Sequence, residues 1–110
     1  YLSLSNSFRS SVVAWSKRLA YDVAPHGITF NNVLTGYFDT DRIAQLNATK
    51  AEKIGVEASE VRKEMEKQVP MKRIGDPVEF AYLATFLASE KAAYITGTNI
   101  PIDGGLLKSM

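Results

Sequence analysis

The alternation of helical and β-rich segments constrains the fold of this chain more than any other feature of its sequence. The expected elements are, in chain order, a helix over 4–24, a strand over 28–34, two helices within 40–68, a helix over 77–89 and a strand over 99–102. This order is typical of an α/β protein with a parallel sheet. Parallel sheets are covered on both faces and normally contain several strands, so two strands do not make an independent one. We therefore expect the chain to be part of a larger α/β domain.

The first helix is predicted from its apolar spacing and from a clear end. Apolar residues recur at steps of three and four, which places them on one helical face. They are Phe8, Val12, Trp15 and Leu19. Pro25-His26-Gly27 ends the helix, because glycine readily adopts the left-handed conformation found there. The uncharged run ITFNNVL that follows indicates a buried parallel strand over Ile28–Leu34.

Capping residues predict the later helix boundaries. Asp39 or Thr40 can cap the first of the two helices within 40–68, which break near Gly55, and Val69-Pro70 stops the second. At the next helix, Asp76 suits the N-cap, Pro77 the first helical position, and Glu79 can complete a capping box. The apolar residues of that helix are Phe80, Leu83, Ala84 and Leu87. After the last strand, we expect Asp103-Gly104-Gly105 to form a turn.

Composition excludes several classes of partner and site. Thirteen basic and twelve acidic residues give a net charge of +1, so nothing indicates a nucleic-acid or anionic-membrane partner. The sequence has no cysteine, which excludes disulfides and thiolate metal sites and makes a reducing cytoplasm the expected location. No apolar run approaches the roughly 20 residues that span a bilayer. No metal site is expected.

Three stretches together resemble the C-terminal half of the short-chain dehydrogenase/reductase family. GITFNNVLTGYFDT (27–40) follows the family pattern G-I-x-V-N-x-(V)-x-P-G-x-(I/V)-x-T, with Phe30 and Phe38 at two of its aliphatic positions and Thr35 in place of the proline. PMKRIGDPVEFA (70–81) follows P-x-x-R-x-G-x-P-x-E-(I)-A, and YITGTNIPIDGG (94–105) matches the family's Y-I-T-G and D-G-G ending. The most similar members are 3-oxoacyl-carrier-protein-reductase-like, including an atypical group with the SNxxR pattern found here at residues 5–9.

The resemblance implies a doubly wound Rossmann fold with a parallel sheet. It implies that residues 1–110 are the C-terminal half of one Rossmann-type domain, and that the N-terminal dinucleotide-binding half is absent from the chain. The family's glycine-rich pyrophosphate loop does not occur in these residues. Residues of about 40–68 correspond to the family's helical substrate lid. We therefore expect the 110-residue chain alone to be inactive and to bind no cofactor tightly.

The resemblance also implies where the reactive groups lie. The family's Tyr-x-x-x-Lys pair, one helical turn apart, falls on Ser5 and Arg9. An aliphatic hydroxyl is a far weaker acid than a phenol, whose pKa is about 10. Ser5 can orient a carbonyl, and Arg9 can hold ribose hydroxyls but cannot be tuned as a buried lysine can. Tyr1 precedes Ser5 by one turn, so it either reaches the same cleft or packs as a terminal residue.

The loop after the first strand is the expected cofactor-binding segment. The resemblance assigns backbone contacts with the nicotinamide carboxamide, and a threonine hydroxyl near the cofactor, to Gly36, Phe38 and Thr40. Thr40 can also simply cap the next helix. The cofactor would be NAD or NADP, bound by the parent protein, meaning the full-length protein that carries this chain.

Two functions remain open at this point. The first is part of an NAD(P)-dependent oxidoreductase that transfers hydride to or from a carbonyl or alcohol substrate, which the loop and the lid favour. The second is a non-catalytic scaffold for nucleotide binding or assembly, which Ser5 and Arg9 favour. The resemblance further implies a homo-oligomer, formed through the first helix, the last helix (77–89) and the last strand (99–102).

Overall fold

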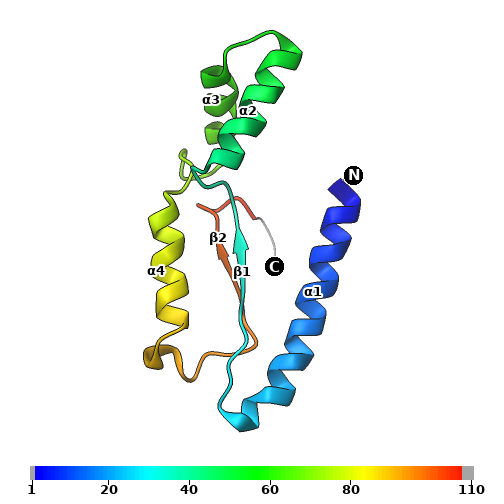
Figure 1. Cartoon of the computed structure of the whole chain (residues 1–110), viewed down its shortest axis with the longest axis vertical. Coiled ribbons are helices and arrows are strands. Elements are labelled where there is room, and N and C mark those ends of the chain that lie inside the picture. The colour runs from blue at the N-terminus through cyan, green and yellow to red at the C-terminus, as the bar shows by residue number, and fades with distance from the viewer. Residues whose placement is uncertain (1, 108–110) are drawn as a thin grey trace. The chain divides into compact units, whose positions relative to one another are not determined.

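The computed structural model describes residues 2–107, with side chains described from Ser10 onward. Figure 1 shows the helices and strands in the predicted order. They are α1 (Leu2–Val23), a 3₁₀ turn (Ala24–His26), β1 (Asn32–Thr35), α2 (Asp41–Ile54), α3 (Ala58–Gln68), α4 (Pro77–Leu87), a second 3₁₀ turn (Glu90–Ala92) and β2 (Asn99–Ile102). The α/β class is therefore confirmed. No helix within residues 2–107 is long and apolar enough to cross a membrane.

The two strands pair in parallel. The Asn32 amide donates to the Thr98 carbonyl at 2.9 Å and the Gly36 amide to the Ile102 carbonyl at 3.1 Å, with the same offset along both strands. Pro101 lies in β2 and has no N–H, a residue that sheets tolerate on edge strands. Within residues 2–107, β1 and β2 thus form a two-stranded parallel sheet.

The first strand differs from its prediction in extent and burial. It begins at Asn32 rather than Ile28, and its first three residues are only half-buried. The preceding backbone is bonded to a loop instead of a strand, since the Phe30 amide donates to the Thr96 hydroxyl and the Phe30 carbonyl accepts from Gly97. The second strand lies where it was predicted, at Asn99–Ile102.

The chain divides into two compact units, described here separately. The first comprises Tyr1–Leu34 and Leu83–Ile100, and the second comprises Thr35–Tyr82 and Pro101–Met110. In the first unit the buried side chains of α1 are Ser16 and Ala20, and the Ser16 hydroxyl donates to the Asn32 side-chain oxygen at 3.3 Å. Because both residues are small, α1 can pack closely against the segment that carries Asn32.

The predicted apolar face of α1 is largely exposed in this chain. Trp15 is 61% exposed and Val12 is 44% exposed, while the Phe8 side chain lies outside the described part. Trp15 has one aromatic neighbour among the described residues, Phe30, whose ring meets it edge-on with centroids 6.2 Å apart. The apolar spacing therefore marks a surface that this chain leaves uncovered.

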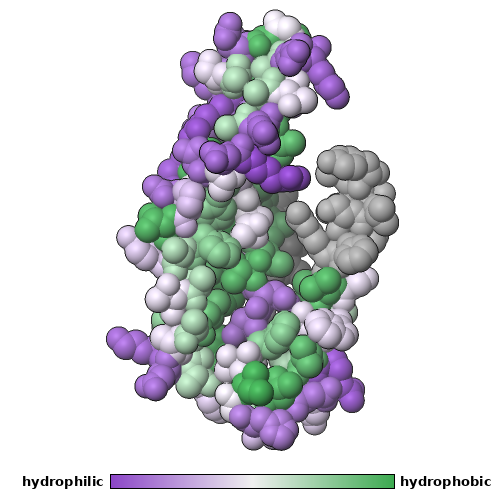
Figure 2. Space-filling model, viewed as in Figure 1, coloured by the Kyte–Doolittle hydropathy of each residue, from purple (hydrophilic) through white to green (hydrophobic). Residues whose placement is uncertain are grey.

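The second unit contains the helical hairpin that the sequence predicted. Thr40, rather than Asp39, caps α2, and its hydroxyl accepts from the Ile43 amide at 3.4 Å. Gly55 ends α2 with a φ of 74°, and Val69 ends α3. The buried apolar residues of this unit are Ala51, Val61, Val69 and Ile74. In Figure 2, hydrophilic side chains cover much of this hairpin. Its core is small, and most of its surface is polar.

Candidate functional site

The loop that leaves β1 passes very close to the turn after β2. A Cβ atom placed on Gly36 would lie 2.6 Å from the Asp103 Cβ and 2.7 Å from its Cα. No side chain fits there, so the glycine is required by this contact and not by a left-handed backbone. The loop's backbone is thereby held at the carboxyl end of the strand, where ligands of open α/β sheets bind.

The turn after β2 is closed by its own aspartate. The Asp103 carboxylate accepts from the Gly105 amide at 2.9 Å and from the Leu107 amide at 2.8 Å. Gly104 and Gly105 both have positive φ, and a Cβ on Gly104 would lie 2.8 Å from Val69. The predicted Asp103-Gly104-Gly105 turn is confirmed, and it also seats the segment that returns from α3.

Phe38 joins the start and the end of the helical hairpin. It forms an isolated parallel bridge with Gly75, in which the Asp39 amide donates to the Gly75 carbonyl and the Gly75 amide to the Tyr37 carbonyl, both at 2.8 Å. A Cβ on Gly75 would lie 2.8 Å from the Phe38 ring. That ring meets Phe80 edge-on, with centroids 6.1 Å apart. We call residues 37–40 with 74–76 the neck, and α2 with α3 the lid.

Thr40 has the capping role described above and keeps a further capacity. Its hydroxyl oxygen accepts from the Ile43 amide, and a hydroxyl can donate its own proton at the same time. The residue is exposed. The capping role is confirmed, and contact with a cofactor remains a prediction for Gly36, Phe38 and Thr40.

Ser5 and Arg9 lie in α1, but their side chains are outside the described part of the chain, and Tyr1 is outside the described residues altogether. The described structure therefore brings together the predicted loop residues in the second unit. The two predicted catalytic positions belong to the first unit. Their roles remain predictions.

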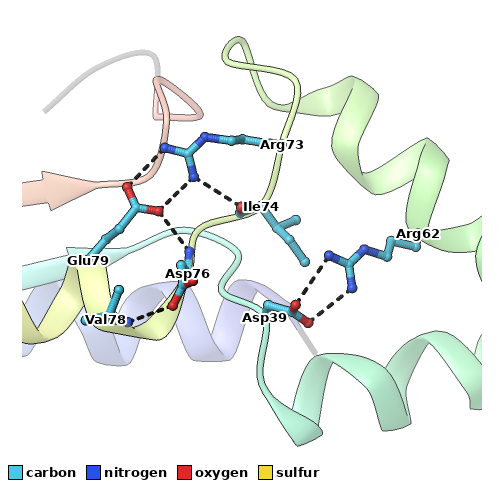
Figure 3. Close-up of polar contacts among 7 residues, drawn as sticks. All are labelled: Asp39, Arg62, Arg73, Ile74, Asp76, Val78 and Glu79. Carbon is cyan, nitrogen blue, oxygen red and sulfur yellow. Dashed lines mark hydrogen bonds and ion pairs between the residues drawn. The ribbon is translucent and has the colours of Figure 1, made fainter.

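A charged pair at the start of α4 was not predicted from the sequence. The Arg73 guanidinium donates to both oxygens of Glu79, at 2.7 and 3.0 Å, and Figure 3 shows the fork-like arrangement. Glu79 also accepts from the Asp76 amide at 2.9 Å, and Asp76 accepts from the Val78 amide at 3.0 Å. The predicted capping box is thus confirmed. The sequence signal for the contact between Arg73 and Glu79 was the position of Arg73, three residues before the N-cap residue Asp76.

The same contacts set the ionisation of the pair. The hydrogen bond from Arg73, followed by the one from the Asp76 amide, lowers the pKa of Glu79 from 4.5 to about 2. In turn the hydrogen bond to Glu79 raises the pKa of Arg73. Both groups stay charged at neutral pH and are engaged with each other. Glu79 is therefore a poor candidate for a general base.

A cavity of about 350 Å³ lies beside this pair, within the second unit. Its lining includes Tyr37, Phe38, Met71, Arg73, Glu79 and Gly104. Aromatic and thioether groups form part of its wall, Arg73 and Glu79 are paired with each other, and the Asp103 carboxylate accepts from backbone amides. The cavity thus offers apolar contact beside charged groups that already have hydrogen-bond partners.

A second ion pair links the neck to the lid. The Arg62 guanidinium on α3 donates to both oxygens of Asp39, at 3.1 and 3.4 Å (Figure 3). Its Nε lies 3.8 Å from a carboxylate oxygen of Glu66, one turn farther along α3. Both side chains of the Asp39 pair are about half exposed. Sequence reasoning considered Asp39 only as a candidate helix cap and did not predict this pairing.

Comparison with known proteins extends over almost the whole chain. Residues 4–107 match the family model described as enoyl-(acyl carrier protein) reductase. The chain is 37% identical over 106 residues to the NADPH-dependent reductase BacG of Bacillus subtilis, covering 96% of this chain and 41% of that protein. It is 38% identical over 98 residues to the 3-oxoacyl-[acyl-carrier-protein] reductase FabG of Vibrio cholerae, covering 89% of this chain and 36% of the relative.

A solved structure agrees with both the sequence likeness and the fold. The crystal structure of a short-chain dehydrogenase family protein from Francisella tularensis superposes with a TM-score of 0.85 at 39% identity, over 88% of this chain and 40% of that one. The chain thus spans about two fifths of the length of the curated relatives it matches. Its strands and helices form part of a Rossmann fold, as predicted. With its three linked motifs, its fold and these matches, the chain belongs to the short-chain dehydrogenase/reductase family.

Proposed function

We propose that the parent protein is an NAD(P)-dependent oxidoreductase that transfers a hydride to or from a carbonyl or alcohol substrate. In this proposal residues 1–110 form the C-terminal half of one Rossmann-type domain, with the lid over about 40–68. The observation that carries the proposal is the contact just before the neck, where Gly36 lets the loop backbone lie against Asp103 and fixes residues 37–40 at the carboxyl end of β1. The reductases among its relatives support the same activity.

Gly36 and the neck residues that follow it fit a nicotinamide cofactor in the chemistry of their groups. Gly36 and Phe38 present backbone, and the exposed Thr40 hydroxyl still has a proton to donate. NAD(P)H, when bound, supplies the hydride. Arg9 would hold ribose hydroxyls through its guanidinium fork, and Ser5 would orient the substrate carbonyl. The lid would close over the substrate and exclude water.

The first experiment measures NADPH oxidation by the parent protein with a 3-oxoacyl thioester, acetoacetyl coenzyme A, as the probe. We expect Arg9→Ala to weaken cofactor binding more than Ser5→Ala does, because Ser5 offers at most one neutral hydrogen bond, worth about 0.5–1.5 kcal/mol. Loss of turnover in Ser5→Ala at unchanged NADPH affinity would make Ser5 a catalytic residue, and a larger loss of affinity in Ser5→Ala than in Arg9→Ala would reverse this ranking.

We further propose that the 110-residue chain on its own neither turns over substrate nor binds NAD(H) or NADP(H) tightly. The family's pyrophosphate loop does not occur in its sequence, so half a site would leave most of the cofactor solvated. Isothermal titration calorimetry with NADPH checks this expectation. Micromolar affinity of the isolated chain would contradict it.

A non-catalytic scaffold is the second candidate, because serine and arginine stand where the family has tyrosine and lysine. The discriminating observation is the coding sequence immediately upstream of Tyr1. A glycine-rich nucleotide loop and an upstream catalytic serine there would support the enzyme. A gene without them would support the scaffold.

We also propose that the parent protein is a homo-oligomer that uses α1, α4 and β2. Val78, Tyr82 and Phe86 recur every four residues along α4 and are 44%, 70% and 42% exposed. Together with Val12 and Trp15 on α1, they are apolar side chains that a partner subunit would cover. Figure 2 shows hydrophobic surface over α4.

Light scattering coupled to size exclusion tests this assembly. We expect Tyr82→Glu to reduce the mass of the parent protein's oligomer. Tyr94→Glu is the matched control, because Tyr94 is fully exposed but lies off the helix stripe. Equal masses for the wild type and Tyr82→Glu would remove α4 from the interface.

A further inference from the structure

The neck holds the two ends of the lid together through backbone hydrogen bonds and close packing. Two backbone hydrogen bonds of 2.8 Å join Tyr37–Asp39 to Gly75, and the Phe38 ring fills the space where a side chain on Gly75 would stand. The lid helices start immediately after this point, at Asp41, and the chain returns to it at Gly75. Because both ends of the lid are attached to residues 37–40 and 74–76, any motion of the lid is a motion relative to these residues.

The lid itself is weakly anchored. Its buried side chains are few and small, and many of its exposed side chains are charged. Few buried apolar contacts and an exposed surface are the properties of segments that open at low cost. When a segment has so few buried contacts, a contact between α3 and the neck has a large influence on the position of the lid.

The Asp39–Arg62 pair is such a contact. It joins residues 23 positions apart and crosses from the neck to α3 through two hydrogen bonds. Arginine binds a carboxylate through two parallel hydrogen bonds, so the pair fixes direction as well as distance. Glu66, on α3 itself, lies 3.8 Å from the same guanidinium and gives it a second carboxylate on the lid side. Arg62 can thus leave Asp39 without losing every anionic neighbour.

We propose that Asp39 and Arg62 form a latch that couples the position of the lid to the cofactor loop. Asp39 lies between Phe38 and Thr40, so a displacement of α3 that moves the Asp39 side chain also moves the backbone of the loop. The pair is half exposed, so water can replace it when the lid opens. Arg62 is a positioning residue. The reading of the loop as cofactor-binding rests on the proposed function, whereas the mechanical coupling does not.

Hydrogen exchange of the parent protein without cofactor tests the coupling. Arg62→Gln should speed exchange of the α3 amides by about twofold to fivefold, the range expected for an exposed ion pair. Lys67→Gln is the matched control, because Lys67 pairs with Glu64 on the same helix and does not reach the neck. Equal exchange in the wild type and both variants would overturn the latch.

A double variant separates coupling from two independent effects. If the latch is real, Asp39→Asn with Arg62→Gln exchanges no faster than either single variant. Additive acceleration would mean that the residues act separately and would overturn the proposal. Arg62→Lys, which keeps the charge but not the two-bond geometry, provides an intermediate variant if Arg62→Gln does not fold.

Steady-state kinetics then connects the latch to the proposed function. We expect Arg62→Gln to raise the KM for NADPH by about twofold to fivefold, with kcat changed by less than about twofold. A wild type without NADPH turnover, but with the exchange difference intact, would refute the proposed function and leave the latch standing. An exchange difference with an unchanged KM would refute the link to the cofactor loop.

Discussion

At the Phe30–Asn32 end of the β1–β2 pair, side-chain hydrogen bonds add to the backbone ones, whereas at the Gly36 end close packing against glycine backbone takes their place. At the first end, the Asn31 amide donates to the Ile95 carbonyl at 3.1 Å, and its oxygen accepts from the Thr98 amide and hydroxyl. At the second end, the contacts depend on glycines that press against Asp103 and Phe38. One end is specified by polar groups, and the other by missing side chains.

This difference bears on what each end can tolerate. A lost hydrogen bond leaves its partners free to bind water if the site can open, so its cost is bounded. A side chain forced into backbone has no such relief, because the neighbouring atoms cannot rotate away. We therefore expect the Gly36 end to be the more fragile, and it is the end that carries the proposed cofactor loop.

Gly36→Ala should have the largest effect of the changes considered. The added methyl would meet the Asp103 Cα and Cβ at 2.7 and 2.6 Å, so backbone must move. We expect a loss of about 3 kcal/mol in the free energy of unfolding of the parent protein, measured by chemical denaturation. Gly55→Ala is the control. Its φ is 74° with nothing within 4 Å, so only backbone strain of about 1 kcal/mol applies.

Asn31→Ala should cost less, about 2 kcal/mol, because it removes three hydrogen bonds but introduces no clash.

Thr96→Val removes the hydroxyl that accepts from the Phe30 amide and should cost about 1 kcal/mol. The same denaturation series checks both. A loss for Asn31→Ala greater than that for Gly36→Ala would reverse the comparison between the two ends.

Glu79→Gln should have a smaller effect than these changes, and one that depends on pH. Folding depresses the pKa of Glu79 to about 2 from its usual 4.5, so its contribution to stability is complete above about pH 4.5. That contribution falls as the carboxylate is protonated and is gone below about pH 2. We therefore expect the wild type and Glu79→Gln to converge in melting temperature between pH 4.5 and 2. A difference that stays constant over this window would contradict the assigned ionisation.

Arg18→Gln provides the baseline for that measurement. Arg18 pairs with Asp22 on the surface of α1 at 3.4 Å, with the arginine side chain 78% exposed. We expect a change within about 0.5 kcal/mol at every pH tested. A larger change would mean that surface charge in general, and not the capping arrangement of Glu79, sets the acid response.

Local signals in the sequence predicted most of the fold. Asp76, Pro77 and Glu79 located the start of α4, and Gly55 located the break in the lid, because capping and left-handed turns depend on neighbouring residues. The contacts missed, namely Arg73 with Glu79 and Arg62 with Asp39, depend on how long charged side chains are brought together by folding. Gly36 was predicted only as a cofactor-binding loop residue, and its contact with Asp103 was missed, since spacing cannot reveal that Asp103 would lie against it.

The Asn31 contacts also determine when the strand pair can form. Their partner Thr98 comes 67 residues later in the chain, whereas the neck joins Phe38 to Gly75 across a much shorter separation. Closing the longer loop costs more entropy, and non-local pairing slows folding. The lid and neck should therefore acquire structure first during synthesis. The β1–β2 pair cannot form until β2 (Asn99–Ile102) has been synthesised, so a chain truncated before Thr98 would lack this pair.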